Sequence, residues 1–202
     1  MTHDRFPALV PLLLKHEGRF VDDPNDPGGA TNMGITIGTL SQWRGWSVTP
    51  DDVLALTQDE ALEIYRAWYW AQPGIGRLPI GIDRAVFDFA VHSGAKRAIM
   101  ALQRVLKVAD DGKLGPISYA AAAKANPVET ITRLIEGRRR FLSRLSIWPR
   151  YRNGWTTRLA EVQDHSLRDL SIAPKPTPAI TPPRPFMTWF KSLFTPTPST
   201  ER

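Results

Sequence analysis

The sequence predicts a mainly α-helical protein with one folded unit, a small loop or hairpin region after the first helix, and a C-terminal extension. Apolar residues recur at helical spacing over most of the first 170 residues. Gly and Pro are concentrated just after the first helical run, and Pro becomes frequent again after residue 170. A chain of 202 residues with 42% hydrophobic content can bury a core, and it fits one domain plus an extension better than two full domains.

The first helix is predicted by apolar residues at helical spacing, Phe6, Leu9, Val10 and Leu13. Glu17 follows four residues after Leu13, at the edge of the face that the helix buries, and directly before a glycine that we expect to end the helix. A carboxylate in the last turn feels the negative end of the helix dipole, and partial burial removes its hydration. We therefore expect a raised pKa at Glu17, which suits a general acid; a solvated glutamate near a helix end is the alternative.

The segment after this helix, residues 22–38, is polar and rich in turn residues. It contains too many Gly and Pro residues for a helix. Short extended pieces or a small hairpin are expected around Ile35 and Ile37.

The rest of the folded unit is predicted to be helical. Thr49 and Thr57 each stand where an N-cap would start a helix, with Pro50 at the first position of one and a capping box over residues 57–60 in the other. The second of these helices is amphipathic and rich in aromatic residues up to about residue 72. Further helices are expected over residues 82–93, 98–106, 116–125, 127–145 and 155–162.

The composition changes after Leu170. Six prolines fall between residues 174 and 185, a density that favours an extended, semi-rigid linker. The following stretch, residues 186–194, is dense in aromatic residues and too short to span a bilayer. Arg184 and Lys191 add positive charge, so we expect this tail to insert at an anionic membrane surface or to dock on a partner; a disordered tail is the alternative.

The net charge favours a polyanionic partner. Lys and Arg number 26 against 20 Asp and Glu, which gives a formal charge of +6. Nucleic acid, anionic lipid and an anionic wall polymer would all be attracted by it, and a solvated basic helix face is the simpler interpretation. Because no nucleic-acid recognition motif is present, we do not expect a nucleic-acid partner.

Several classes of site are excluded or disfavoured. The chain has no Cys, so disulfides, thiolate metal sites and cysteine nucleophiles are excluded. The four His residues lack metal-ligand spacing, and the acidic loop lacks a third oxygen ligand at EF-hand spacing, so neither a metal nor another cofactor is expected.

The N-terminus lacks the features of a secretory signal, and we therefore expect synthesis in the cytoplasm and release by another route.

The stretch over residues 16–36 reads HEGRFVDDPNDPGGATNMGIT. It resembles the signature of glycoside hydrolase family 108, a family of bacterial and phage N-acetylmuramidases. The sequence departs from the family pattern at Arg19, where a second Gly is usual. Residues 65–70, 88–94, 102–116 and 154–158 look like later blocks of the same family, so the resemblance covers nearly all of residues 6–170.

The resemblance implies a lysozyme-like, two-lobed helical fold. It divides the folded unit into a catalytic half at residues 1–95 and a helical peptidoglycan-binding half at 96–170. The linker at 171–185 and the tail at 186–202, which the composition predicts, lie outside the resemblance. It implies hydrolysis of the β-1,4 bond between N-acetylmuramic acid and N-acetylglucosamine in peptidoglycan. Glu17 matches the essential acid of the family.

A glycosidase generally pairs its acid with a second carboxylate. Asp26, eight residues after Glu17, is the first candidate, with Asp22 and Asp23 as rivals and turn or capping roles as the alternative for all three. Phage-type lysozymes show a similar spacing between the Glu and the Asp, and a Thr follows it. In this sequence Asn32 stands at the position that corresponds to that Thr, and Thr36 is also available to position water.

Further substrate contacts are expected from Tyr69 and Trp70, which could stack on sugar rings. At helical spacing Trp68 suits the core better, and Trp70 is expected to be the exposed one. His92 stands where the family usually has Asn, so we count it among the substrate-binding candidates. His16 points about 100° away from Glu17 on a helix and is expected at the surface.

The sequence thus favours a monomeric, endolysin-like muramidase that acts in the periplasm or cell wall after holin-type or specialised release. A lytic transglycosylase also needs one Glu but forms 1,6-anhydro products. A non-catalytic wall-binding protein or secretion helper that has kept only the fold is the alternative from a different class. Phage lysis and bacterial secretion are both compatible with this sequence.

Overall fold

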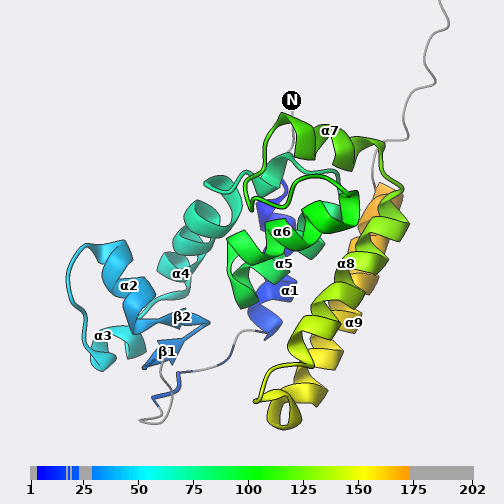
Figure 1. Ribbon diagram of the computed structural model, residues 1–202. Helices are drawn as coiled ribbons and strands as arrows, with labels where there is room; N and C mark the ends of the chain where they lie inside the picture. The colour runs from blue at the N-terminus through cyan, green and yellow to red at the C-terminus, as the bar shows by residue number, and fades with distance from the viewer. Residues whose placement is uncertain (1–3, 17, 19, 23–28, 173–202) are drawn as a thin grey trace, which may run out of the picture.

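The computed structural model describes residues 4–16, 18, 20–22 and 29–172. Within them the fold is helical with one small hairpin, and two lobes are joined through the helical segment 58–71, as expected for a lysozyme-like protein (Figure 1). The elements in chain order are α1 (Phe6–His16), β1 (Thr31–Asn32), β2 (Ile35–Thr36), α2 (Ile37–Arg44), α3 (Pro50–Leu54), α4 (Gln58–Ile64), the π-helix η1 (Tyr65–Ala71), the 3-10 helix η2 (Ile75–Arg77), α5 (Ile82–Ser93), α6 (Ala95–Leu106), α7 (Pro116–Lys124), α8 (Pro127–Leu142) and α9 (Trp148–Ile172).

The hairpin belongs to the smaller lobe, together with α2 and α3 (Figure 1). Its strands pair antiparallel with Thr31 opposite Thr36, and its two-residue loop, Met33 and Gly34, has positive φ at both positions. This geometry matches the right-handed twist of paired strands. The Tyr65 hydroxyl donates a hydrogen bond to the Met33 carbonyl and so ties the turn to η1.

Threonine caps begin the helices of this lobe. Thr36, Thr49 and Thr57 each accept a hydrogen bond from the backbone N–H three residues on, and Thr49 forms a complete capping box with Asp52. The predicted starts at Thr49 and Thr57 are therefore confirmed. The prediction of extended structure at Ile37 is wrong, because the cap at Thr36 makes Ile37 the first residue of α2.

The aromatic-rich segment is a π-helix, and this changes which side chains are buried. A π-helix has more than 3.6 residues per turn, so positions drift relative to the α-helical pattern on which the sequence analysis relied. Trp70 is only 6% exposed and packs against Phe6 and Phe87, with ring centroids 6.1 and 5.5 Å apart, respectively. Trp68 is half-buried against Trp43. The expectation that Trp70 is the exposed residue is wrong.

The larger lobe is a bundle in which α5 packs against α6, α8 and α9 (Figure 1). At the start of α5, Gly81 has φ +85°, and a Cβ there would lie 2.6 Å from the Ser166 carbonyl of α9. This close approach requires glycine. The predicted helices over 82–93 and 116–125 are observed with nearly these bounds, whereas α8 ends at Leu142 and α9 starts at Trp148, seven residues before the predicted start.

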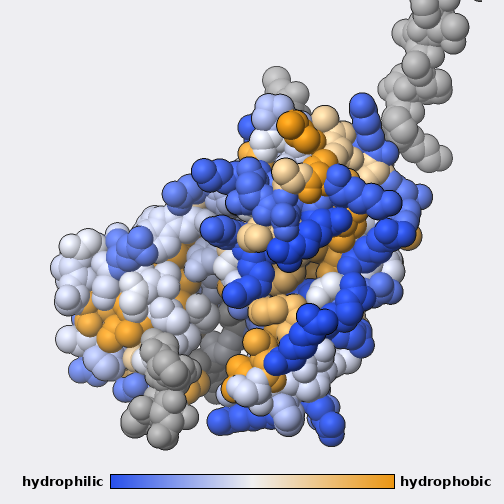
Figure 2. Space-filling view, in the orientation of Figure 1, coloured by the Kyte–Doolittle hydropathy of each residue, from blue (hydrophilic) through white to orange (hydrophobic). Residues whose placement is uncertain are grey.

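The C-terminal part of the chain is only partly described. Residues 171–172, which we assigned to the linker, form the last part of α9, and the remainder of the linker and the aromatic tail lie outside the described residues. Among the described helices, none combines the length and apolar character needed to cross a membrane. Figure 2 shows hydrophilic surface over much of α6 and α8, with a narrower hydrophobic strip between them.

Candidate functional site

The candidate acids lie mostly outside the described residues. This applies to Glu17, Asp23 and Asp26, whereas Asp22 is described and exposed. The neighbours of Glu17 in the chain are placed: His16 is the last residue of α1, and Gly18 accepts a hydrogen bond from the Met33 backbone N–H at 3.2 Å. Two backbone hydrogen bonds then join Val21 to Thr31, so residues 18 and 21 run beside the hairpin.

The end of α1 is held against α9. Glu161 of α9 contacts Lys15 at 2.7 Å, and its carboxylate lies 3.1 Å from His16 Nε2. The His16 side chain is 11% exposed, so the prediction of a surface role is wrong: the end of α1 packs against α9 instead of facing solvent. Burial and the nearby Arg158 guanidinium lower the pKa of His16, against the opposing effects of Asp88 and Glu161.

The two hairpin candidates have structural roles. The Asn32 side-chain amide donates to the carbonyls of Val53 and Leu54 at 3.0 and 3.3 Å, which fixes β1 to the end of α3. Thr36 Oγ1 caps α2 by accepting from the Thr39 N–H at 3.2 Å, and it lies 3.0 Å from the Thr39 hydroxyl. Both side chains are half-buried, so a substrate role for either would be added to a role that already explains its position.

The two aromatic candidates differ. Trp70 is part of the core between α1 and α5, so its expected stacking on substrate is excluded by burial. Tyr69 is half-buried and lies edge-to-face with Tyr65 at 5.9 Å. Tyr69 therefore remains a candidate for contact with a ligand.

The C-terminal half of α5 carries a buried charged cluster, formed by Asp88, Arg138 and Arg158. Arg138 Nη1 lies 2.7 Å from Asp88 Oδ2, and Arg158 Nε contacts both carboxylate oxygens at 2.9 and 3.0 Å. Burial by itself would raise the pKa of Asp88, but the two guanidinium groups outweigh it and hold that pKa well below its usual range. Asp88 is therefore a permanent anion and cannot act as a proton donor near neutrality.

His92 lies one helical turn after Asp88 on α5. Its Nδ1 is 2.9 Å from the Ser93 hydroxyl, and its ring meets Trp155 of α9 edge-on at 5.5 Å. Burial, with Arg138 and Arg158 nearby, lowers the pKa of His92 to about 3. His92 is neutral at physiological pH, so it can take part in hydrogen bonds but is not a proton donor of the imidazolium type.

An aromatic cluster extends from His92 along the first turns of α9. Trp155 stacks on Tyr151 with an interplanar angle of 21° and lies 5.9 Å from Trp148. Tyr151 is exposed and the two tryptophans are half-buried, so part of this cluster is open to a ligand. Flat aromatic surfaces of this kind suit the apolar faces of sugar rings.

Sequence reasoning placed residues 88–94 and 154–158 in family blocks but did not bring them together. The available signal was an acid with apolar residues on both sides of it in the sequence, at 85–87 and 89–91, which generally needs a buried partner. The partners of Asp88 are 50 and 70 residues away in sequence, so spacing alone does not identify them. Within the described ranges, no three His, Cys, Asp or Glu side chains gather as metal ligands would.

Comparisons with known proteins identify the family. The model of glycosyl hydrolase 108 matches residues 10–94. A solved structure, that of Brucella abortus SagA, is 41% identical to the chain, with a TM-score of 0.76, and the match covers 81% of this chain and 94% of SagA. A search of curated proteins finds no match. With this identity over nearly the whole length of a solved relative in the same family, the chain belongs to the glycosyl hydrolase 108 family and is a glycoside hydrolase.

Proposed function

We propose that the protein is a muramidase that hydrolyses the β-1,4 bond between N-acetylmuramic acid and N-acetylglucosamine in peptidoglycan. The observation that carries this proposal is the family match over residues 10–94, because this range includes Glu17 and the entire loop that follows it. The glycoside hydrolase family supports a glycan substrate, and the exposed aromatic surface at Tyr151 is compatible with one.

In the proposed mechanism Glu17 donates a proton to the leaving oxygen of the glycosidic bond. A second oxygen group activates water or stabilises the developing positive charge, and Asp26 is our first candidate for it. Thr36 Oγ1 already accepts the capping bond from the Thr39 N–H and lies 3.0 Å from the Thr39 hydroxyl, so it would position water with its remaining hydrogen-bonding capacity. Asp88, held as an anion by two arginines, supports the surrounding helices and takes no part in proton transfer.

We also propose that the enzyme works as a monomer in the periplasm or cell wall after a holin-type or specialised release. Contact of the C-terminal tail with an anionic membrane is part of this proposal. The charge of +6 supports attraction to either anionic surface. Liposome binding that survives deletion of residues 173–202 would remove the role of the tail.

Glu17→Gln tests the proposed acid. General acid catalysis contributes about 10²- to 10⁴-fold, so clearance of purified peptidoglycan should fall by at least about 100-fold while the circular dichroism spectrum and melting temperature stay unchanged. Glu63→Gln, at an exposed position of α4, is the matched control and should keep full activity. A folded Glu17→Gln protein that clears peptidoglycan at the wild-type rate would exclude Glu17 as the acid.

Asp26→Asn tests the second group in the same assay. A large loss at Asp26, with smaller losses for Asp22→Asn and Asp23→Asn, supports the assignment. The opposite order would move the role to one of the two rivals. Binding of all these variants to peptidoglycan without turnover, wild type included, would instead indicate a wall-binding protein.

A further inference from the structure

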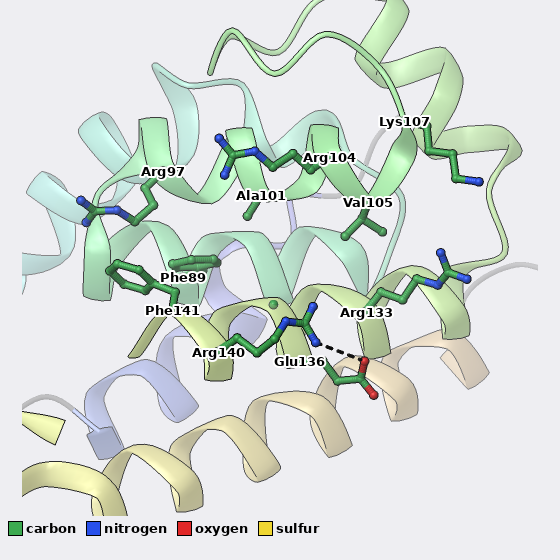
Figure 3. Close-up of a pocket in the computed structure, with 11 residues that line it drawn as sticks. Phe89, Arg97, Ala101, Arg104, Val105, Lys107, Arg133, Glu136, Arg140 and Phe141 are labelled. Carbon is green, nitrogen blue, oxygen red and sulfur yellow. Dashed lines mark ion pairs between the residues drawn. The ribbon is translucent and has the colours of Figure 1, made fainter. Parts of the chain in front are cut away.

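A basic groove lies between α6 and α8 and has a volume of about 570 Å³; none of Asp88, His92, Arg138 and Arg158 lines it. Five cations and one carboxylate, Glu136, line it. The α6 side contributes Arg97, Arg104 and Lys107, and α8 contributes Arg133 and Arg140 (Figure 3). All five basic residues are exposed, and no function described above uses them.

The floor of this groove is apolar. Ala101 and Val105 of α6 face it together with Phe141 of α8, and the Arg97 guanidinium lies over the Phe141 ring at 4.7 Å. Arg97 also donates to the Ser93 carbonyl at 2.9 Å, so its side chain is already fixed at one end of the groove. A ligand that suits this groove therefore combines anionic groups at the rim with an apolar face toward the floor.

Gly137 is a second, independent sign of a binding site. It lies in the interior of α8, where glycine costs roughly 0.5–1 kcal/mol relative to alanine. Its φ is not positive, and a Cβ added there would meet only the end of the Arg140 side chain, at 3.8 Å. Neither backbone conformation nor packing requires this glycine. What the missing Cβ does provide is open space in the wall of the groove.

The ion pairs at the rim are weak enough to exchange. Arg104 pairs with Asp110, Arg133 with Glu129 and Arg140 with Glu136, and every one of these side chains is at least 43% exposed. Exposed pairs contribute little to stability, so a ligand can replace them at small cost. Guanidinium groups on both sides of a groove suit phosphate best, because phosphate carries more charge than a carboxylate and offers three acceptor oxygens.

We propose that the groove between α6 and α8 binds a phosphorylated saccharide. The phosphate would lie among the arginines of the two walls, and the apolar face of the sugar would lie on the floor around Phe141. The volume is that of a small-ligand site and exceeds what a lone phosphate fills. A nucleic-acid duplex is too wide to reach a floor between two packed helices, and the short apolar floor offers no channel for an acyl chain. The inference does not depend on Glu17 or on the bond that the enzyme cleaves.

The test is calorimetric titration of the full chain with N-acetylglucosamine 6-phosphate, with N-acetylglucosamine and inorganic phosphate as separate arms. We expect the sugar phosphate to bind, phosphate alone to bind at least 5-fold more weakly, and the neutral sugar not to bind at the same concentrations. Arg97→Gln and Arg140→Gln should each weaken binding by at least 5-fold. Arg139→Gln, an exposed arginine of α8 outside the groove, is the matched control and should have no effect.

Gly137→Ala separates a binding role from a structural one. The added methyl group should raise the melting temperature, because alanine favours the helix, and should weaken sugar phosphate binding by at least 5-fold. Unchanged binding in this variant, or an equal loss in Arg139→Gln and Arg140→Gln, would overturn the proposal. The proposal would also be overturned if the protein bound duplex DNA or phosphatidylglycerol vesicles more tightly than the sugar phosphate and Arg140→Gln abolished that binding. Wall hydrolysis by Gly137→Ala should stay at the wild-type level, which keeps this test distinct from that of Glu17.

Discussion

The two halves of α5 carry buried aspartates whose pKa values shift in opposite directions. Asp83 and Asp88 are 1% and 5% exposed, so burial does not distinguish them. Burial raises the pKa of Asp83 against the single guanidinium of Arg5, whereas two guanidinium groups lower the pKa of Asp88. The comparison teaches that the number of converging arginines, more than burial, decides the direction in which the pKa of a carboxyl in this core shifts.

The two clusters also serve different parts of the molecule. At the N-terminal end, Arg5 and Arg84 pair with Asp83 and Asp169, which joins the start of α1 to α5 and to the end of α9. In the C-terminal half, the arginines around Asp88 also act on His16 and His92. The first cluster is a structural clamp, and the arginines of the second add to the effect of burial, which lowers the pKa values of His16 and His92.

The largest expected effect comes from the Asp88 cluster. Asp88→Asn removes the carboxylate that Arg138 and Arg158 both contact, and breaking a buried pair in this way costs about 3–5 kcal/mol. We expect the free energy of unfolding in urea to fall by this amount. A loss below about 1 kcal/mol would show that the cluster contributes little to the bundle.

A smaller loss of stability is expected from the substitution of Asp83. Asp83→Asn keeps an oxygen that can accept from the backbone N–H groups of Gly81 and Arg84, and it loses only the contact with Arg5. Because the charged form of Asp83 is already disfavoured by burial, the cost should be about 1–2 kcal/mol. Equal losses for Asp83→Asn and Asp88→Asn in the same urea series would contradict the contrast between the two aspartates.

The third effect is the dependence of stability on pH through His92, which accumulates gradually with each pH unit. Its pKa of about 3 in the folded protein lies below the ordinary value of 6.5, so between these values the unfolded chain binds a proton that the folded chain does not. The stabilisation from neutral His92 is complete above about pH 6.5 and is lost as the pH falls toward 3, with a slope of roughly 1.4 kcal/mol per pH unit.

Urea titrations at pH 7, 6 and 5 measure this slope. His92→Asn should reduce it between pH 6.5 and 5, and His165→Asn in α9 provides the control. An unchanged slope in His92→Asn would mean that the pKa of His92 is not lowered in the folded protein. His16 shifts in the same direction, so a residual slope in the His92 variant is expected.

The fold was largely predictable from local signals, and the candidate site was not. The caps at Thr49 and Thr57 and the helix over 82–93 follow from residues close in sequence, and the structure confirms them. The burial of Trp70 depends on a π-helix, whose different period no α-helical pattern reveals. The burial of His16 depends on α9, about 145 residues further along the chain, so only the tertiary structure places it.

The family blocks carried more information than the composition did. The loop signature and the blocks at 88–94 and 154–158 indicated glycoside hydrolase family 108, and the family match and the likeness to SagA confirm that family. The net charge left the polyanionic partner open, because long-range attraction does not depend on the kind of anion. The roles of Glu17 and Asp26 remain predictions that only activity can test.

Mass spectrometry of the fragments released from purified peptidoglycan tests the central claim most directly. Hydrolysis by a muramidase should release muropeptides that end in a reducing N-acetylmuramic acid, each heavier by one water than its 1,6-anhydro counterpart and convertible by borohydride to the alcohol. Release should be lost in Glu17→Gln. Products with 1,6-anhydro ends, or with reducing N-acetylglucosamine, would contradict the proposed reaction.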